Sequence, residues 1–240
     1  MLRSAGPALN DTVPSTGPPP DATIPRRLPG FLAAFVFRDY RQLWIGAFLS
    51  SLGTWTQDVA LAWLIHVRMG DPFYLGLRAF AAETPLIAFM LVGGAMADRI
   101  SRRLILLTSQ VLQMTFAAVL GVLYVTDHLG IGAILAAAFL TGLCQSQSAP
   151  TYQAVLTTAV PPPQIPNAVA LNSLQFNLSR AIGPVIAGVL LARGGTGTCF
   201  FVNVVSFLAV IVALARIHIP PPSPTAWTAG ASCSPPRSSR

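Results

Sequence analysis

Three ionisable residues lie inside long apolar stretches of the sequence, and they are the first candidates for chemistry. Asp58, Glu83 and Arg180 each fall near the middle of such a stretch. A charged side chain at the centre of a membrane-spanning helix costs about 2.5–3.5 kcal/mol on insertion scales. The three residues therefore require partners or a water-filled cavity, and we expect them to mark the depth at which ions or small molecules bind.

Two acids and one base leave this group with a net charge of minus one. We expect Arg180 to pair with one carboxylate, while the other takes up and releases a proton because removal from water disfavours its charged form. Glu83 is the favoured proton carrier, since it stands beside Pro85 in an otherwise apolar helix. A purely structural group that holds helices together remains an open alternative.

Uncharged polar residues form a second pattern downstream. Asn172, Gln175 and Ser179 recur at spacings of three and four, which places them on one face of a helix. They could line a cavity and bind a polar molecule, or they could hydrogen-bond a neighbouring helix within the membrane. The sequence leaves both interpretations open.

Gly183 and Pro184 follow in the same stretch. Proline removes one backbone donor, so this pair permits a helix kink. With Ala187 and Gly188 it also gives a thin surface on which another helix can approach closely.

The elements that must position these residues are membrane-spanning helices. Hydrophobic residues make up 53% of the 240 residues and charged residues only 10%, which is too apolar for an ordinary soluble domain. The sequence predicts an all-α membrane protein. We expect six transmembrane helices, at residues 42–67, 74–97, 104–126, 130–157, 166–192 and 195–217.

The predicted organisation has three parts. Residues 1–40 form a disordered, Pro-rich tail that ends in a short amphipathic segment, Phe31–Tyr40, on the membrane surface. Residues 41–218 form the six-helix unit, and residues 219–240 form a second disordered tail. With both termini cytoplasmic, eleven arginines fall inside and only Arg68, Arg78 and Arg193 outside, as the positive-inside rule requires.

Several functional classes are excluded by the sequence. The arginines lie at helix ends and form no single basic face, so we expect no nucleic-acid binding. The three cysteines lack metal-ligand spacing, and no stretch resembles a catalytic triad or a phosphate loop. We therefore predict no enzyme activity, no metal and no cofactor.

A compact charged turn connects the second and third predicted helices. Its residues are Gly94-Ala-Met-Ala-Asp98-Arg99-Ile-Ser-Arg102-Arg103. This G-x-x-x-D-R-x-x-R-R pattern resembles the corresponding loop of major facilitator transporters, although Ser101 stands where that family usually has Gly. The resemblance implies that Asp98 sits near a helix N-terminus of a second half, and that the arginines tie a cytoplasmic gate. Enforcement of topology by the arginines alone is the alternative.

Other stretches resemble the exporter branch that includes enterobactin exporters and drug-efflux proteins. They are Ser51–Trp55, Ala62–Leu64, Pro166–Ser173 and Arg180–Pro184, within a resemblance that covers roughly residues 35–218. It implies half of a major facilitator fold, built from two inverted three-helix repeats. It also implies proton-coupled efflux of amphipathic small molecules, siderophore- or drug-like, across the bacterial inner membrane.

The expected partners are the small-molecule substrate, membrane lipid, and a second six-helix half or a second copy of the chain. After Ile219-Pro220 the resemblance stops, and the Pro-, Ser- and Arg-containing end is the composition that a shifted reading frame would produce. A truncated, non-transporting membrane remnant or a docking subunit is therefore the alternative function.

Overall fold

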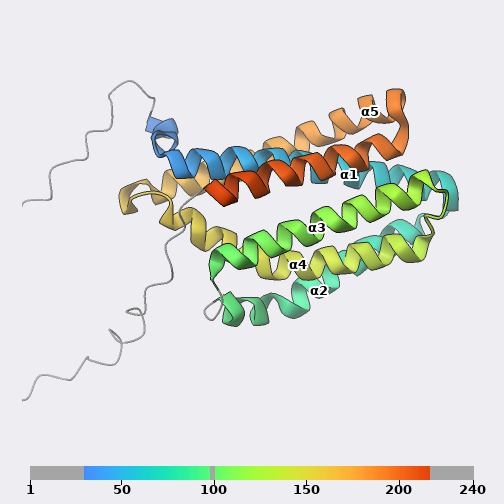
Figure 1. Ribbon diagram of the computed structural model, residues 1–240, viewed down its shortest axis with the longest axis horizontal. Helices are drawn as coiled ribbons and strands as arrows, with labels where there is room; N and C mark the ends of the chain where they lie inside the picture. The colour runs from blue at the N-terminus through green and yellow to red at the C-terminus, as the bar shows by residue number, and fades with distance from the viewer. Residues whose placement is uncertain (1–29, 98–100, 217–240) are drawn as a thin grey trace, which may run out of the picture.

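The computed structural model describes residues 30–97 and 101–216, and all elements in these ranges are helical. They are, in chain order, the 3₁₀ helix η1 (Gly30–Val36), α1 (Arg38–Met69), α2 (Phe73–Ala97), α3 (Arg102–Val125), α4 (Ile131–Thr158), the 3₁₀ helix η2 (Pro162–Gln164) and α5 (Ile165–Arg216). The predicted all-α class is confirmed for this part of the chain (Figure 1).

Helix α5 consists of two arms that run in opposite directions. At Gly195 the backbone has φ 71° and ψ −179°, a conformation outside the helical region that favours glycine. The chain turns back there, as Figure 1 shows at the far end of α5. We call residues 165–194 the first arm and residues 196–216 the second arm. The turn lies at the break expected between the stretches 166–192 and 195–217.

The helices pack in two groups that α3 connects. Helix α1 packs against α5, α2 packs against α4, and α3 contacts both α4 and α5, whereas α1 and α2 contact each other little. Two buried clusters fill the interior. The first includes Leu43, Leu106 and Leu156, and the second includes Ile65, Leu120 and Phe200.

Helix α1 lies between the two arms of α5, and glycines let the backbones come close. A Cβ atom added to Gly53 would lie 2.6 Å from Oδ1 of Asn203 in the second arm. A Cβ atom on Gly183 in the first arm would overlap Cβ of Trp55. Small residues commonly allow such contacts between membrane helices. The thin surface expected near Gly183 is thus a real contact, but Gly188 is exposed with nothing near it, and the helix continues through Pro184.

The start of the bundle is held by η1 and the first turns of α1. Ala33 and Ala34 are buried, the Tyr40 hydroxyl donates to the Ala168 carbonyl at 3.0 Å, and Trp44 Nε1 donates to the Leu171 carbonyl at 3.0 Å. The segment Phe31–Tyr40 is therefore packed on α1 and α5 over part of its length, with Tyr40 already inside α1.

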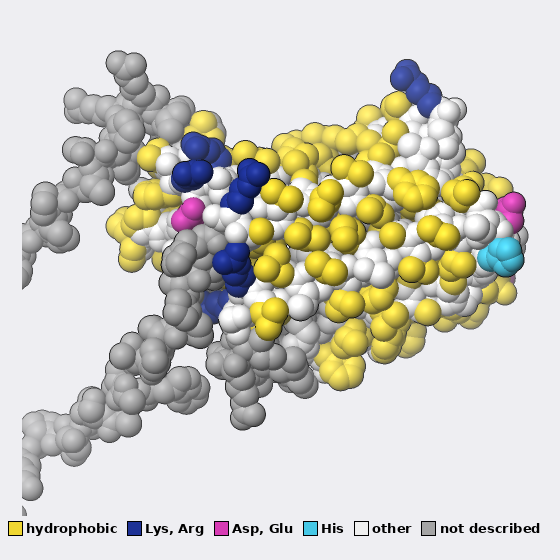
Figure 2. All heavy atoms as spheres, in the orientation of Figure 1, with side chains coloured by type: hydrophobic (Ala, Val, Ile, Leu, Met, Phe, Trp, Pro, Cys, Tyr) yellow, Lys and Arg dark blue, Asp and Glu magenta, His cyan; other side chains and the backbone are white. Residues whose placement is uncertain are grey.

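The flank of the bundle is apolar and its ends are charged. Figure 2 shows hydrophobic side chains along the flank; most of the visible arginines gather at one end beside an acidic side chain, and the other end shows acidic and histidine side chains with a further arginine. Among the described residues, three helical stretches are long and apolar enough to cross a membrane: Arg102–Val125, Ile131–Thr158 and Pro162–Arg216. The last of these contains both arms of α5.

The close contact at Gly183 predicts a sharp difference between two glycines of the same arm. Gly183→Ala should lower the free energy of unfolding by about 1–3 kcal/mol, because the new methyl group overlaps α1. Gly188→Ala should leave stability unchanged or raise it slightly, since alanine favours helix and the site is open. Unfolding of the purified protein in detergent measures both, and equal effects would contradict the described packing.

Candidate functional site

An ion pair joins α1 to α2, two helices that otherwise have few contacts with each other. Arg78 Nη2 donates to Asp58 Oδ1. The Arg78 side chain is 20% exposed and that of Asp58 is 38% exposed, so water screens the pair only in part. We expected Arg180 to pair with one carboxylate, but in the described chain Asp58 pairs with Arg78.

Arg180 lies on an exposed face of the first arm. It follows the buried Ser179 by one residue, about 100° further round the helix, so it does not share the buried face through which Ser179 hydrogen-bonds α1. The guanidinium carbon stands 5.5 Å from the centre of the Trp55 ring, a cation–π arrangement. Within the described ranges, Arg180 forms no ion pair.

Glu83 is exposed on the surface of α2. Phe80 and Ile87, one turn before and one turn after it, are 69% and 74% exposed. Its neighbour Pro85 faces the other way and is buried close to Gly142 of α4. In the described part of the chain, Glu83 has no ion-pair partner. The three ionisable residues thus occupy three different settings and do not form one group.

The polar face predicted on the fifth stretch serves helix packing. Gln175 Nε2 donates to Ser51 Oγ at 3.0 Å and to the Ala47 carbonyl at 3.3 Å. Ser179 Oγ donates to the Phe48 carbonyl at 3.4 Å. Both side chains are buried against α1. The structure therefore favours hydrogen bonding between helices over a cavity for these two residues.

Asn172, the third member of that face, binds a different helix. Its Oδ1 accepts a hydrogen bond from the Tyr152 hydroxyl of α4 at 3.2 Å.

Another contact that sequence reasoning missed joins α1 to the second arm. There Asn203 Nδ2 donates to Gln57 Oε1 at 2.8 Å, and Ser206 Oγ donates to Asn203 Oδ1 at 3.0 Å.

A second polar face on the first arm points out of the bundle. Ser173, Asn177 and Arg180 are spaced by four and three residues, and all three are exposed. Asn177 Nδ2 donates to the Ser173 carbonyl at 2.8 Å. We call these three residues the exposed polar stripe. Helical spacing in the sequence also identifies this stripe. It does not show which of the two polar faces of the helix, this one or that of Asn172, Gln175 and Ser179, is buried.

The charged turn is described only in part. Gly94 belongs to α2, while Asp98 and Arg99 lie outside the described residues. Arg102 and Arg103 begin α3, and Arg103 Nη2 donates to the Ala215 carbonyl at 2.5 Å. A basic side chain on the last carbonyls of a helix is favourable. Arg103 thus fastens the start of α3 to the end of α5.

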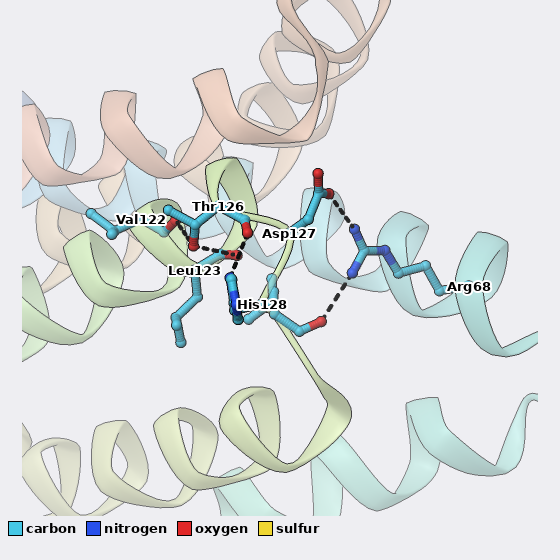
Figure 3. Close-up of polar contacts among 7 residues, drawn as sticks. Arg68, Val122, Leu123, Thr126, Asp127 and His128 are labelled. Carbon is cyan, nitrogen blue, oxygen red and sulfur yellow. Dashed lines mark hydrogen bonds and ion pairs between the residues drawn. The ribbon is translucent and has the colours of Figure 1, made fainter.

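The opposite end of the bundle is fastened by Arg68 of α1 (Figure 3). Its Nη1 donates to the Leu129 carbonyl at 2.9 Å, its Nη2 lies 3.8 Å from Asp127 Oδ1, and its guanidinium stands 5.8 Å from the Tyr124 ring centre. Asp127 has a positive φ of 57° in the tight turn between α3 and α4. These contacts join the end of α1 to that turn.

The sequence matches a known protein family. A sequence profile described as "Transmembrane secretion effector" matches residues 30–224. The chain belongs to this family of major facilitator transporters. It is 30% identical over 173 residues to the staphyloferrin A transporter of Staphylococcus aureus (strain NCTC 8325 / PS 47), covering 72% of this chain and 44% of that protein.

Two further likenesses agree with this family. The multidrug efflux pump Tap of Mycolicibacterium fortuitum is 23% identical over 178 residues, covering 72% of this chain and 44% of the pump. Crystal structures of the peptide transporter POT, in complex with sulfate or with alafosfalin, superpose on 80% of this chain and 42% of POT with a TM-score of 0.63 at 15% identity, a likeness of fold alone. The family and the apolar helices make this a multi-pass membrane protein.

The chain spans less than half the length of the curated relatives that it matches. The share is 44% of the staphyloferrin A transporter and 39% of YfiS of Bacillus subtilis, an uncharacterized MFS-type transporter that is 27% identical over 167 residues.

The ion pair between α1 and α2 predicts strong coupling between its two residues. Asp58→Asn and Arg78→Gln should each destabilise the protein, because each leaves a partly buried charge without its partner. The double variant should be more stable than the sum of the two losses predicts, with a coupling energy of about 1–3 kcal/mol. A double-mutant cycle from unfolding in detergent measures this energy, and additive losses would contradict the ion pair.

Proposed function

We propose that this protein supplies the N-terminal half of a proton-coupled exporter in the bacterial inner membrane. In this proposal, α1 to α4 and the two arms of α5 make six spans, related as two inverted three-helix repeats, with both chain ends in the cytoplasm. The arginines at one end of the bundle support that orientation. A second six-helix half or a second copy of the chain completes the transporter.

One observation supports this function most directly. Glu83 and Arg180 are exposed charges on largely apolar helices and have no ion-pair partner among the described residues. Ionisable residues at membrane depth face a bundle interior or a water-filled cavity, because hydrocarbon disfavours charge. Transporters place substrate and ion sites at that depth, between their repeats. Two such residues on separate helices therefore favour a transport pathway over a passive membrane segment.

Glu83 is the proposed proton carrier. Asp58 is bound to Arg78, so its protonation would break an ion pair, whereas Glu83 can accept a proton without that cost. Export, as opposed to uptake, is supported by the likeness to the multidrug efflux pump Tap. A siderophore-like or drug-like amphipathic substrate is supported by Tap together with the staphyloferrin A transporter.

The charged turn is proposed as the cytoplasmic gate. Gly94, Asp98, Arg99, Arg102 and Arg103 would close it against the second half, with Asp98 near a helix N-terminus where an acidic group is favoured. Support comes from Arg103, which already joins two helix ends at this side of the bundle.

The proton-carrier assignment predicts the behaviour of two acid variants. In inside-out membrane vesicles, a proton gradient should drive uptake of ethidium or of 8-anilinonaphthalene-1-sulfonate above the level of vesicles without the protein. Glu83→Gln should remove the dependence of uptake on the gradient and leave the amount of inserted protein unchanged, because the amide cannot carry a proton. Fluorescence of either dye and an immunoblot measure both quantities.

Asp71→Asn serves as the control. Asp71 is exposed in the turn before α2, and its Oδ1 accepts a hydrogen bond from the Phe73 amide at 2.8 Å, which asparagine can also accept. This variant should retain gradient-driven uptake. Proton-driven uptake that persists in Glu83→Gln would refute the carrier assignment, and uptake of neither dye by the unaltered protein would refute export of these dyes by copies of this chain alone.

A further inference from the structure

The exposed polar stripe and the Trp55 ring together form a surface that helix packing does not explain. Gln175 and Ser179 already supply the hydrogen bonds between the first arm and α1. Ser173, Asn177 and Arg180 lie on the outer side of the same arm and are exposed. In the described part of the chain, none of these three side chains forms a hydrogen bond or an ion pair with another helix.

The charges around this surface leave one cation uncompensated. Asp58, one turn beyond Trp55 on α1, is neutralised by Arg78. Arg180 has no carboxylate partner among the described residues and is the one charged residue of the segment from 129 to 192. A guanidinium facing hydrocarbon is strongly disfavoured, so the site calls for water and an anion.

The aromatic rings beside Arg180 determine which of its N–H groups can bind an anion. The guanidinium lies over the face of Trp55, and Phe176 meets the same ring edge-to-face at 5.9 Å. Stacking on an aromatic face leaves the N–H groups at the rim of the guanidinium free to donate, and their fork matches a carboxylate in a bidentate geometry. The two aromatic rings offer apolar contact beside that charge.

We propose that Arg180, Trp55 and the exposed polar stripe form a substrate subsite for a carboxylate on an amphipathic molecule. Arg180 binds the carboxylate, the rings of Trp55 and Phe176 contact the adjoining apolar part, and Asn177 offers a further polar group. This subsite deepens the proposed transport function and rests on it. Its substrate class is acidic amphipathic molecules, and neutral analogues bind weakly.

A binding experiment tests the subsite separately from transport. A full-length variant in which phenylalanine replaces Trp44, Trp63 and Trp227, so that Trp55 is the only tryptophan, is placed in lipid nanodiscs and titrated with citrate and with its uncharged triethyl ester. Citrate should change Trp55 fluorescence in a saturable way, and the ester should not. Arg180→Gln should weaken citrate binding at least about tenfold, as expected when a charge-assisted hydrogen bond is lost. Arg180→Lys should retain part of the binding.

Arg193→Gln provides the matched control, because Arg193 is also an exposed arginine of the first arm but lies at its end. It should bind citrate as the unaltered chain does, and circular dichroism checks that each variant is folded. Equal responses to citrate and ester, or unchanged binding in Arg180→Gln, would overturn the subsite. No citrate response from the unaltered chain would also overturn the subsite.

The two proposals can fail separately. Citrate binding that depends on Arg180, without gradient-driven dye uptake in vesicles, would refute the transport function and keep the anion site. Gradient-driven uptake without Arg180-dependent citrate binding would keep transport and refute the substrate class.

Discussion

The cost of placing charge in hydrocarbon is the constraint on which the rest of this structure depends. Each charged side chain away from the helix ends has surroundings that reduce this cost. Asp58 and Arg78 neutralise each other across α1 and α2. Arg180 rests on the Trp55 ring, and Glu83 reaches the exposed surface of α2. Only Asp58 and Arg78 form an ion pair within the described chain. Glu83 and Arg180 therefore require water, a ligand or a further helix beside them.

Close packing around α1 places these groups. The two arms of α5 hold α1 on two sides, with Gly53 and Gly183 removing the side chains that would keep the backbones apart. Gln175 and Asn203 then add hydrogen bonds along the two contacts. Because the first arm packs so closely at Gly183, Trp55 is brought under Arg180 one turn earlier. The exposed cation is therefore a consequence of the same packing that stabilises the bundle.

The helix positions could be predicted from sequence because their signals are local. Long apolar stretches and breaks at Gly70-Asp71-Pro72, the charged turn and Gly195 placed α1 to α4 and both arms of α5 within a few residues. The partner of Asp58 could not be predicted, because the pairing depends on how α1 and α2 are placed side by side. Arg78 also stands near the start of α2, where it was counted as a residue of the outer side.

The sequence also could not predict which face of the first arm is buried. Asn172, Gln175 and Ser179 satisfy helical spacing as well as Ser173, Asn177 and Arg180 do, and only the position of α1 decides which set is buried. Asn172, Gln175 and Ser179, for which a cavity and helix packing were both open interpretations, hydrogen-bond neighbouring helices in the structure. The exposure of Arg180 depends on the same packing, so the proposed subsite could not be recognised from local sequence spacing alone.

Access of water to the exposed polar stripe is the central claim, and cysteine labelling tests it directly. In a background without the native cysteines, Asn177→Cys and Leu178→Cys place a thiol at nearly the same depth on neighbouring exposed faces of the first arm. A charged, membrane-impermeant thiol reagent applied to the full chain in lipid vesicles should modify Asn177→Cys and spare Leu178→Cys. Protection of both positions would show that the stripe faces lipid or another helix, and would contradict the account.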